Sequence, residues 1–165
     1  MNEPEDRTDV DREGRIIVRR PGDARAIDVG GFTVDVLADD ADTGRRFSLI
    51  ETAEAEAGLG PPLHIHRDCA EAFVVLAGRY AMHIDGREYD CPPGSFVHVP
   101  RGVVHTFRTL DAGSRKLNLY APAGMIGYFD ELAAGIATGL SDVDLDAIAE
   151  RYEMTVVGPI PKGYL

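Results

Sequence analysis

The sequence lacks the features that mark several large classes of protein. It has only two cysteines in 165 residues, too few for a disulfide-stabilised scaffold, and we interpret both as reduced thiols of a cytoplasmic protein. Basic residues are scarce, because 17 Lys and Arg stand against 28 Asp and Glu, for a formal net charge of -11. This balance argues against nucleic acid as a partner and against docking on an anionic membrane, since both need clustered Lys and Arg.

Long apolar segments are also missing. No stretch approaches the roughly 18 apolar residues of a membrane span, and the N-terminus MNEPEDRTDVDREGR has no apolar region of the kind that a signal peptide needs. Residues 1–14 are mostly charged or polar, so we expect an acidic mobile arm, either a solvated tail or a segment that docks on a partner subunit. The total length is that of one domain.

The sequence does contain, from Arg15 onward, short apolar runs between turn residues. The runs lie at residues 16–18, 32–37, 47–53, 63–66, 71–77, 80–84, 87–91, 95–99, 105–109 and 116–121. Asp85-Gly86 stands between two of them and predicts a tight hairpin. Many short strands with regularly spaced turns predict an all-β sandwich or barrel, which we place at residues 15–122.

After residue 122 the apolar period changes. Apolar residues from Met125 to Ile136 recur at helical spacing, with Gly139 as the expected end of the helix. The segment Ser141–Asp144 has the form of a capping box and opens a second helix. We expect residues 123–165 to form a small helical cover over one face or mouth of the barrel.

Three histidines and one glutamate have a spacing suited to metal ligation. His64 and His66 are two apart in an expected strand, so both imidazoles leave the same face, with Cα atoms roughly 6.7 Å apart. Glu71 opens the next strand, and His105 starts a later one. The four side chains can converge on one divalent ion, and this ligand set fits Zn, Fe, Mn, Co, Ni or Cu better than Ca or Mg.

The same residues lie in two motifs that resemble those of the cupin superfamily. The first motif is carried by Gly58, His64, His66, Glu71 and Gly78, and the second by Gly94, Pro100, Arg101, Gly102 and His105. Between them stand 15 residues, a spacing similar to that of microbial single-domain cupins. One departure is Thr109, where the second motif often ends in Asn.

The resemblance implies a fold and a metal site. The fold is an all-β cupin jelly-roll barrel, a double-stranded β-helix, here with a small C-terminal helical segment. The site is one divalent transition metal ion per chain, held by His64, His66, Glu71 and His105. The superfamily also implies a homodimer packed through the sheets of two barrels, to which the run near Ile16 would contribute by swapping.

Two further stretches resemble bacterial quercetin 2,3-dioxygenase-like cupins. They run from Ala38 through His64 and from Ala149 to Pro159. Enzymes of that group cleave a flavonol ring with dioxygen, using nickel, cobalt, manganese, iron or copper. The resemblance therefore implies an oxidoreductase, a metal-dependent dioxygenase acting on a flavonol-like or other enolisable aromatic substrate. Glu71 would be the catalytic residue, both a metal ligand and the general base for the substrate hydroxyl.

The expected walls of the substrate pocket are apolar. Strand parity places Phe73 and Val75 on the face of Glu71, and Phe107 on that of His105. The remaining candidates come from the strand between them: Tyr80, Met82 and His83. Such walls suit a flat aromatic better than a small dianion such as oxalate, although any barrel interior is apolar.

The remaining histidines and both cysteines have less defined roles. His83 would bind substrate or tune a ligand if it points inward, a question that parity alone leaves open. We interpret His98 as exposed or hydrogen-bonded, and Cys69 and Cys91 as structural or incidental.

Two other classes of function use the same ligands. One is an isomerase or decarboxylase in which the metal acts as a Lewis acid without oxygen. The other is a non-enzymatic cupin that binds a small molecule or senses a metal. Oxygen-independent turnover would identify the first, and a thermal shift that responds to ligands but not to metal would favour the second.

Overall fold

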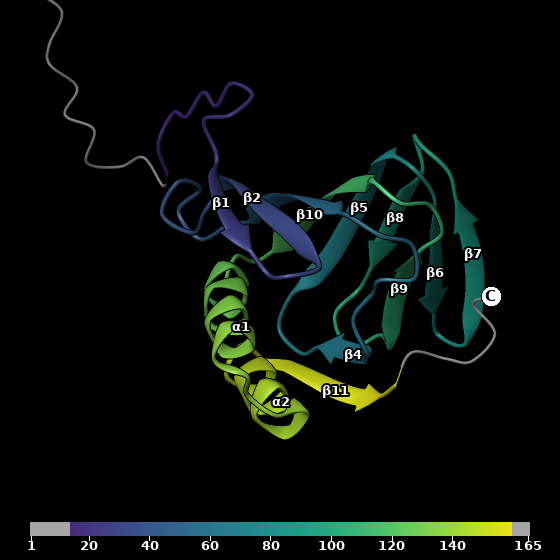
Figure 1. Cartoon of the computed structure of the whole chain (residues 1–165). Coiled ribbons are helices and arrows are strands. Elements are labelled where there is room, and N and C mark those ends of the chain that lie inside the picture. The colour runs from purple at the N-terminus through teal and green to yellow at the C-terminus, as the bar shows by residue number, and fades with distance from the viewer. Residues whose placement is uncertain (1–13, 160–165) are drawn as a thin grey trace, which may run out of the picture.

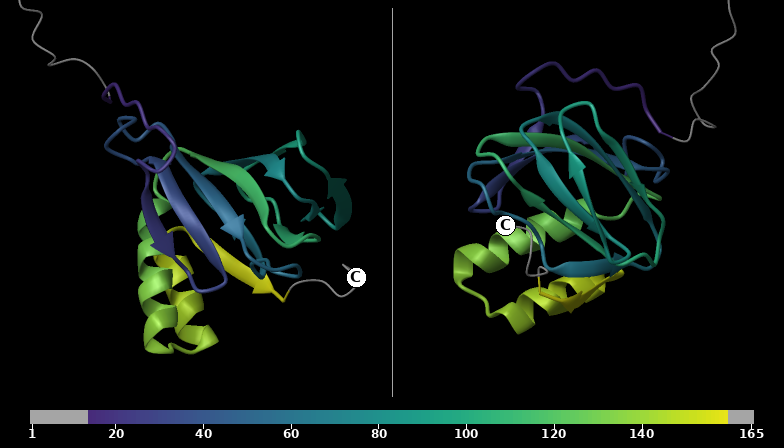
Figure 2. Two further views of the ribbon diagram at one scale, coloured as in Figure 1. Left: turned by 45° about the horizontal axis from the view of Figure 1, so that its top comes forward. Right: turned by 90° about the vertical axis from the view of Figure 1, so that its right-hand side faces the viewer.

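Two antiparallel sheets make up most of the computed structural model, which describes residues 14–159 (Figure 1). The six-stranded sheet has the order β1-β2-β3-β10-β5-β8, and the five-stranded sheet has the order β11-β4-β9-β6-β7. The strands are β1 Arg25–Asp28, β2 Phe32–Ala38, β3 Ser48–Glu54, β4 Leu63–His66, β5 Ala70–Ala77, β6 Tyr80–Ile84, β7 Arg87–Cys91, β8 Phe96–Val99, β9 His105–Thr109, β10 Ser114–Ala121 and β11 Met154–Gly158. The sheets face each other in the jelly-roll arrangement that the sequence predicts (Figure 2).

Period-two alternation positions the interior. In β3 and β10 every second residue is buried, beginning with Ser48 and Ser114 respectively. One face of each strand therefore lines the space between the sheets, and the other forms the outer surface. Two apolar clusters fill the interior, one centred on Val34, Ile50 and Phe129, the other on Phe73 and Tyr80.

The tight turns follow the predicted chemistry. Asp85 and Gly86 have φ values of 49° and 75°, which is the left-handed pair that a two-residue hairpin between β6 and β7 needs.

Thr109, the departure from the second motif, has a structural role. Its hydroxyl accepts from the backbone N–H of Leu59 and donates to the carbonyl of Glu56, so it fixes the loop that leads into β4.

The prediction of a strand at Ile16–Val18 is wrong. This segment pairs with no strand within residues 14–159, and Ile16 and Val18 are 84% and 73% exposed. It is held through polar contacts, because Arg15 and Arg19 both bind the buried carboxylate of Asp42. The edge of the sheet is formed instead by β1, whose sequence RAID shows little apolar alternation and is a strand because it pairs with β2.

The C-terminal part contains the two expected helices, α1 Ile126–Thr138 and α2 Asp142–Arg151. Gly139 ends α1 in the left-handed region, and the Ser141 hydroxyl caps α2 by accepting from the N–H of Asp144, as predicted. Neither helix of the described residues is long and apolar enough to cross a membrane. The expected arm, except Gly14, and residues 160–165 of the expected cover lie outside the described residues.

Besides the two helices, the predicted cover contains a strand, β11. This strand pairs antiparallel with β4 and so joins the five-stranded sheet. The helices lie beside β1 and β2 at one end of the sandwich, and β11 continues along β4 (Figures 1 and 2). The C-terminal part is thus hydrogen-bonded to the strand that carries His64 and His66.

Candidate metal centre

Four predicted ligands converge between the two sheets. His64 and His66 come from β4, and His64 lies directly opposite His105 in the pairing of β4 with β9. Glu71 comes from β5 in the other sheet. All four side chains are buried, and one ligand atom from each lies within 4.8 Å of the others. We call these four residues the histidine cluster.

Backbone carbonyls orient two of the imidazoles. The Nδ1–H of His64 donates to the carbonyl of Pro62 over 2.8 Å, and that of His105 donates to Val103 over 2.9 Å. A carbonyl only accepts, so Nδ1 carries the proton in both rings. Nε2 is thereby left to face the centre of the cluster, an arrangement typical of metal-binding histidines.

Glu71 presents its two oxygens to different partners. Oε2 lies 3.2 Å from Nε2 of His66 and 2.9 Å from Nε2 of His105, while Oε1 accepts from the amide of Asn118 over 2.8 Å. Burial opposes ionisation, but the close imidazoles of His105 and His66 hold the pKa of Glu71 well below its ordinary value. Glu71 is therefore a carboxylate at neutral pH.

The donor set fits a divalent cation. Burial, and then the neighbouring His105 and His66, lower the pKa of His64 to about 3, so this ring is neutral and able to ligate. His105 has oxygen acceptors at both ring nitrogens, whereas a neutral imidazole has only one N–H. A cation between Nε2 of His105 and the carboxylate of Glu71 satisfies both groups. A divalent ion bound by the three imidazoles and the carboxylate does this while every imidazole stays neutral.

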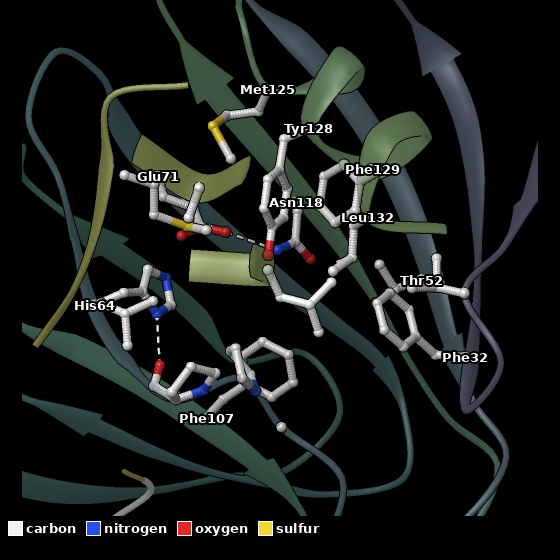
Figure 3. Close-up of a pocket in the computed structure, with 18 of the residues that line it drawn as sticks. Phe32, Thr52, His64, Glu71, Phe107, Asn118, Met125, Tyr128, Phe129 and Leu132 are labelled. Carbon is white, nitrogen blue, oxygen red and sulfur yellow. Dashed lines mark hydrogen bonds between the residues drawn. The ribbon is translucent and has the colours of Figure 1, made fainter. Parts of the chain in front are cut away.

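A cavity of about 860 Å³ borders the cluster (Figure 3). His64, His66 and Glu71 line one part of it. Most of the remaining wall is apolar and comes from both the sheets and α1: Phe32, Phe73, Phe107, Met125, Tyr128, Phe129 and Leu132. The cavity therefore joins the candidate metal site to a space that is walled by aromatic rings and by the helical cover.

The predicted pocket residues occupy two different places. Phe73 and Phe107 line the cavity, with their rings edge to face at 6.1 Å. The others lie outside its lining: Val75, Tyr80 and Met82 are buried in the apolar cluster behind it, and His83 is half-buried on β6 opposite Thr106. Of the remaining residues, His98 is exposed, and both cysteines are buried and free.

Three further buried polar side chains line the same cavity: Thr52, Glu54 and Lys116. The ammonium of Lys116 donates to the hydroxyl of Thr52 over 2.6 Å and to the carboxylate of Glu54. Glu54 also accepts from the hydroxyls of Thr52 and Tyr80. The Lys116 nitrogen lies 3.9 Å from the centre of the Phe107 ring. We call Lys116, Glu54, Thr52 and Tyr80 the lysine cluster.

Sequence reasoning did not find Asn118, Lys116 or the cavity residues of α1. In β10 the polar residues Lys116 and Asn118 are buried, and Leu117 and Leu119, which alternate with them, lie on the outer face. Polar and apolar residues alternate in the sequence of this strand, but the apolar face of such a strand is ordinarily assigned to the interior. The apolar residues of α1 were expected to pack, and several of them line the cavity instead.

Comparisons with known proteins agree with this architecture. Residues 52–116 match the family model for the cupin domain. Over 109 residues the chain is 27% identical to quercetin 2,3-dioxygenase of Bacillus subtilis (strain 168), a match that covers 66% of this chain. It covers 32% of that protein, so the chain spans about a third of the length of the curated relative.

Solved structures show the same fold. The polyketide cyclase RemF from Streptomyces resistomycificus is 26% identical with a TM-score of 0.56, and the match covers 66% of this chain and 80% of that one. An RmlC-like cupin from Shewanella frigidimarina NCIMB 400 is 17% identical with a TM-score of 0.58, and the match covers 68% of this chain and 96% of that one.

Proposed function

Because the chain contains a cupin domain and resembles the quercetinase-like cupins, we propose that it is a metal-dependent dioxygenase of enolisable aromatic compounds such as flavonols. One observation carries the proposal: an aromatic-walled cavity borders the buried histidine cluster. The likeness to quercetin 2,3-dioxygenase, which spans two thirds of this chain, supports it.

The cavity suits a flat, mostly apolar molecule. Its volume of about 860 Å³ falls within the range of ligand pockets, about 300–1,000 Å³. The rings of Phe107, Tyr128 and Phe129 offer faces and edges for stacking. Few unpaired polar groups are available to a small dianion, because Lys116 is bonded to Glu54. Selectivity for an aromatic follows from these walls.

The residues of the cluster have distinct tasks in the proposed reaction. A bound transition metal ion would supply a Lewis-acidic and redox-active centre held by His64, His66, Glu71 and His105. Glu71 takes the proton from the substrate hydroxyl, since it is an ionised carboxylate at the edge of the cavity. The apolar walls exclude water and so strengthen the electrostatic interactions around the resulting anion.

The test is oxygen uptake with quercetin by metal-free protein reconstituted separately with Ni, Co, Mn, Fe, Cu and Zn. Uptake with a redox-capable ion and none with zinc supports the proposal and identifies the working metal. The Glu71→Ala variant is expected to lose uptake while it retains part of its metal binding through the three histidines. Absence of uptake with every ion, and with other enolisable aromatics, overturns the dioxygenase assignment.

A second candidate is chemistry without oxygen, such as isomerisation or decarboxylation. The likeness to a polyketide cyclase favours this candidate, because a cyclase is an enzyme but not an oxygenase. The same ligands and the same base serve such a reaction. Metal-dependent turnover of an aromatic substrate under strict anaerobiosis would replace the dioxygenase by this candidate. Metal-independent binding without turnover would leave a small-molecule-binding protein.

We also propose a homodimer formed through the outer face of the six-stranded sheet. Phe96 of β8, Val74 of β5 and Leu117 of β10 are neighbours across that face. Phe96 is 68% exposed and Leu76 beside it is 39% exposed. Burial of such a row against a second copy is favourable. Light scattering of the wild type is expected to give twice the mass of one chain, and that of the Phe96→Glu variant the mass of a monomer. A monomeric wild type contradicts the proposal.

A cytoplasmic location is likewise a proposal. It is supported by two buried cysteines that remain free thiols, which fits a reducing compartment. Cell fractionation of the native host tests it, and recovery from the periplasm or the medium would contradict it.

A further inference from the structure

Asn118 differs from the other polar residues of the cavity because the two ends of its amide have different surroundings. The residue is 3% exposed, projects inward from β10 and lines the cavity beside the histidine cluster. Its Nδ2 donates to Glu71 Oε1 over 2.8 Å and lies 3.4 Å from the hydroxyl of Tyr120. Its Oδ1 is buried and has no hydrogen-bond partner among residues 14–159.

Glu71 determines which way this amide faces. A carboxylate oxygen only accepts, so exchange of the two ends of the amide would place Oδ1 against Oε1 and lose the hydrogen bond. Oδ1 therefore lies on the side of Asn118 away from Glu71, as Figure 3 shows. In the view of Figure 3, Leu132 and Thr52 lie on this side of Asn118, and both line the cavity.

The polar side chains beyond Asn118 do not supply a donor to Oδ1. Lys116 and Thr52 direct their hydrogen bonds to each other and to Glu54. Most of the remaining wall is formed by rings and aliphatic groups, and neither the Tyr120 nor the Tyr128 hydroxyl is bonded to Oδ1. A buried acceptor without a donor is unfavourable, and a ligand or water that brings one removes the penalty. Oδ1 thus marks a position where a bound molecule donates.

We propose that Asn118 is a positioning and specificity residue of this site. Its Oδ1 accepts a hydrogen bond from a hydroxyl or N–H of the bound molecule, and its Nδ2 holds Glu71 Oε1 so that Oε2 stays directed at His66 and His105. The ligand is then a compound with a donor close to the atom that meets the histidine cluster. An ether at the same place leaves Oδ1 unpaired and is rejected.

The inference rests on the proposed function only in requiring that a small aromatic enters this cavity. The first test therefore uses zinc-loaded protein, in which quercetin is bound without redox chemistry. Dissociation constants are measured for quercetin and its mono-O-methyl ethers. Wild type is expected to bind quercetin about 10- to 100-fold more tightly than one of the ethers. The Asn118→Leu variant is expected to bind the two compounds about equally tightly. A preference for quercetin that persists in this variant overturns the inference.

Ser48→Ala is the matched control. The hydroxyl of Ser48 is also buried without a partner among the described residues, but Ser48 does not line the cavity. Its removal is expected to leave the preference unchanged. The absorption spectrum of bound cobalt gives a second readout: Asn118→Leu alters it because Glu71 Oε1 is released, and Ser48→Ala does not. An unaltered spectrum in Asn118→Leu overturns the positioning role.

A crystal structure of the ligand-free zinc protein separates this inference from the proposed function. An ordered water bound to Oδ1 supports the donor position, even if the protein binds no flavonol and the proposed substrate class fails. An Oδ1 that is bonded to a donor of the protein itself overturns the inference, whatever the protein binds.

Discussion

The barrel interior holds two clusters of buried polar side chains, and they differ in how completely their groups are paired. In the lysine cluster one ammonium meets one carboxylate, and the hydroxyls of Thr52 and Tyr80 complete the hydrogen bonding of Glu54. In the histidine cluster one carboxylate oxygen faces two imidazoles, and Nδ1 of His66 has no partner among the described residues. The first cluster is closed, and the second is open.

The difference shows which of the two has a function beyond holding the fold. Buried polar groups are ordinarily paired, because an unpaired one is unfavourable in a low-dielectric interior. The lysine cluster obeys this rule and joins β3, β6 and β10. In the histidine cluster two imidazole Nε2 atoms share one carboxylate oxygen, and a cation bound among them would satisfy all three groups. Incomplete pairing, rather than buried polarity itself, distinguishes the candidate site.

Breaking the closed cluster is expected to have the largest effect. Lys116→Met leaves the buried carboxylate of Glu54 without its counter-charge, which costs about 3–5 kcal/mol of unfolding free energy. Urea denaturation measures the loss. The double variant Lys116→Met, Glu54→Gln is expected to recover most of it, since the glutamine oxygen still accepts from Tyr80. A double variant no more stable than the single one would show that the ion pair is not the cause.

Filling the open cluster is expected to have the next largest effect. A divalent ion at a hundredfold excess over its dissociation constant stabilises the folded protein by about 2.7 kcal/mol. His64→Gln is expected to lose this gain, because one of the four ligands is absent. Thermal unfolding with and without zinc measures it. Equal metal-induced shifts in the variant and the wild type would exclude His64 as a ligand.

The pH dependence of the metal-free protein sharpens the comparison further. His64 has a folded pKa of about 3 and an ordinary value of 6.5, so between these values the unfolded chain takes up a proton that the folded one does not. Stability therefore falls with decreasing pH in this window, by up to about 1.4 kcal/mol per unit. From pH 6.5 to 5.5, which lies above the ordinary pKa of 4.5 of Glu71, His64→Gln is expected to flatten the slope. An unchanged slope contradicts a neutral His64.

The smallest expected effect is that of replacing Cys69, a residue next to the open cluster in the sequence. Cys69 lies between His66 and Glu71 in the sequence, and burial raises the pKa of its thiol to about 12. A protonated thiol is a poor ligand, so Cys69→Ser is expected to leave metal affinity unchanged. Wild type loaded with cobalt should likewise show no sulfur-to-metal charge-transfer band. Such a band would add a fifth ligand to the site.

Much of the fold and of the open cluster could be predicted from the sequence because both depend on local pattern. His64 and His66 share a face by strand parity, and Gly139 and Ser141 delimit the helices by their backbone chemistry. The strand at Ile16–Val18 was wrong because β-branching reports propensity and not pairing. A tertiary contact, Arg15 and Arg19 on Asp42, decides that segment.

The closed cluster could not be predicted, for a related reason. Lys116 is buried only because Glu54 and Thr52 on β3 and Tyr80 on β6 meet it there, and these residues are far apart in the sequence. Asn118 depends on Glu71 in the same way. A pattern read along one strand assigns such residues to the outer face, where leucines stand in this protein.

The pairing of β11 with β4 limits which parts of this sequence can change during evolution. Met154 lies opposite His66, and Val156 lies opposite His64. A C-terminal segment exchanged for that of another cupin would remove one hydrogen-bonded side of the ligand strand. Substitutions on the inner faces of α1 and α2 alter the cavity without touching that strand. Substitutions in the helices can therefore change the cavity, while β11 has to be retained together with the histidine cluster.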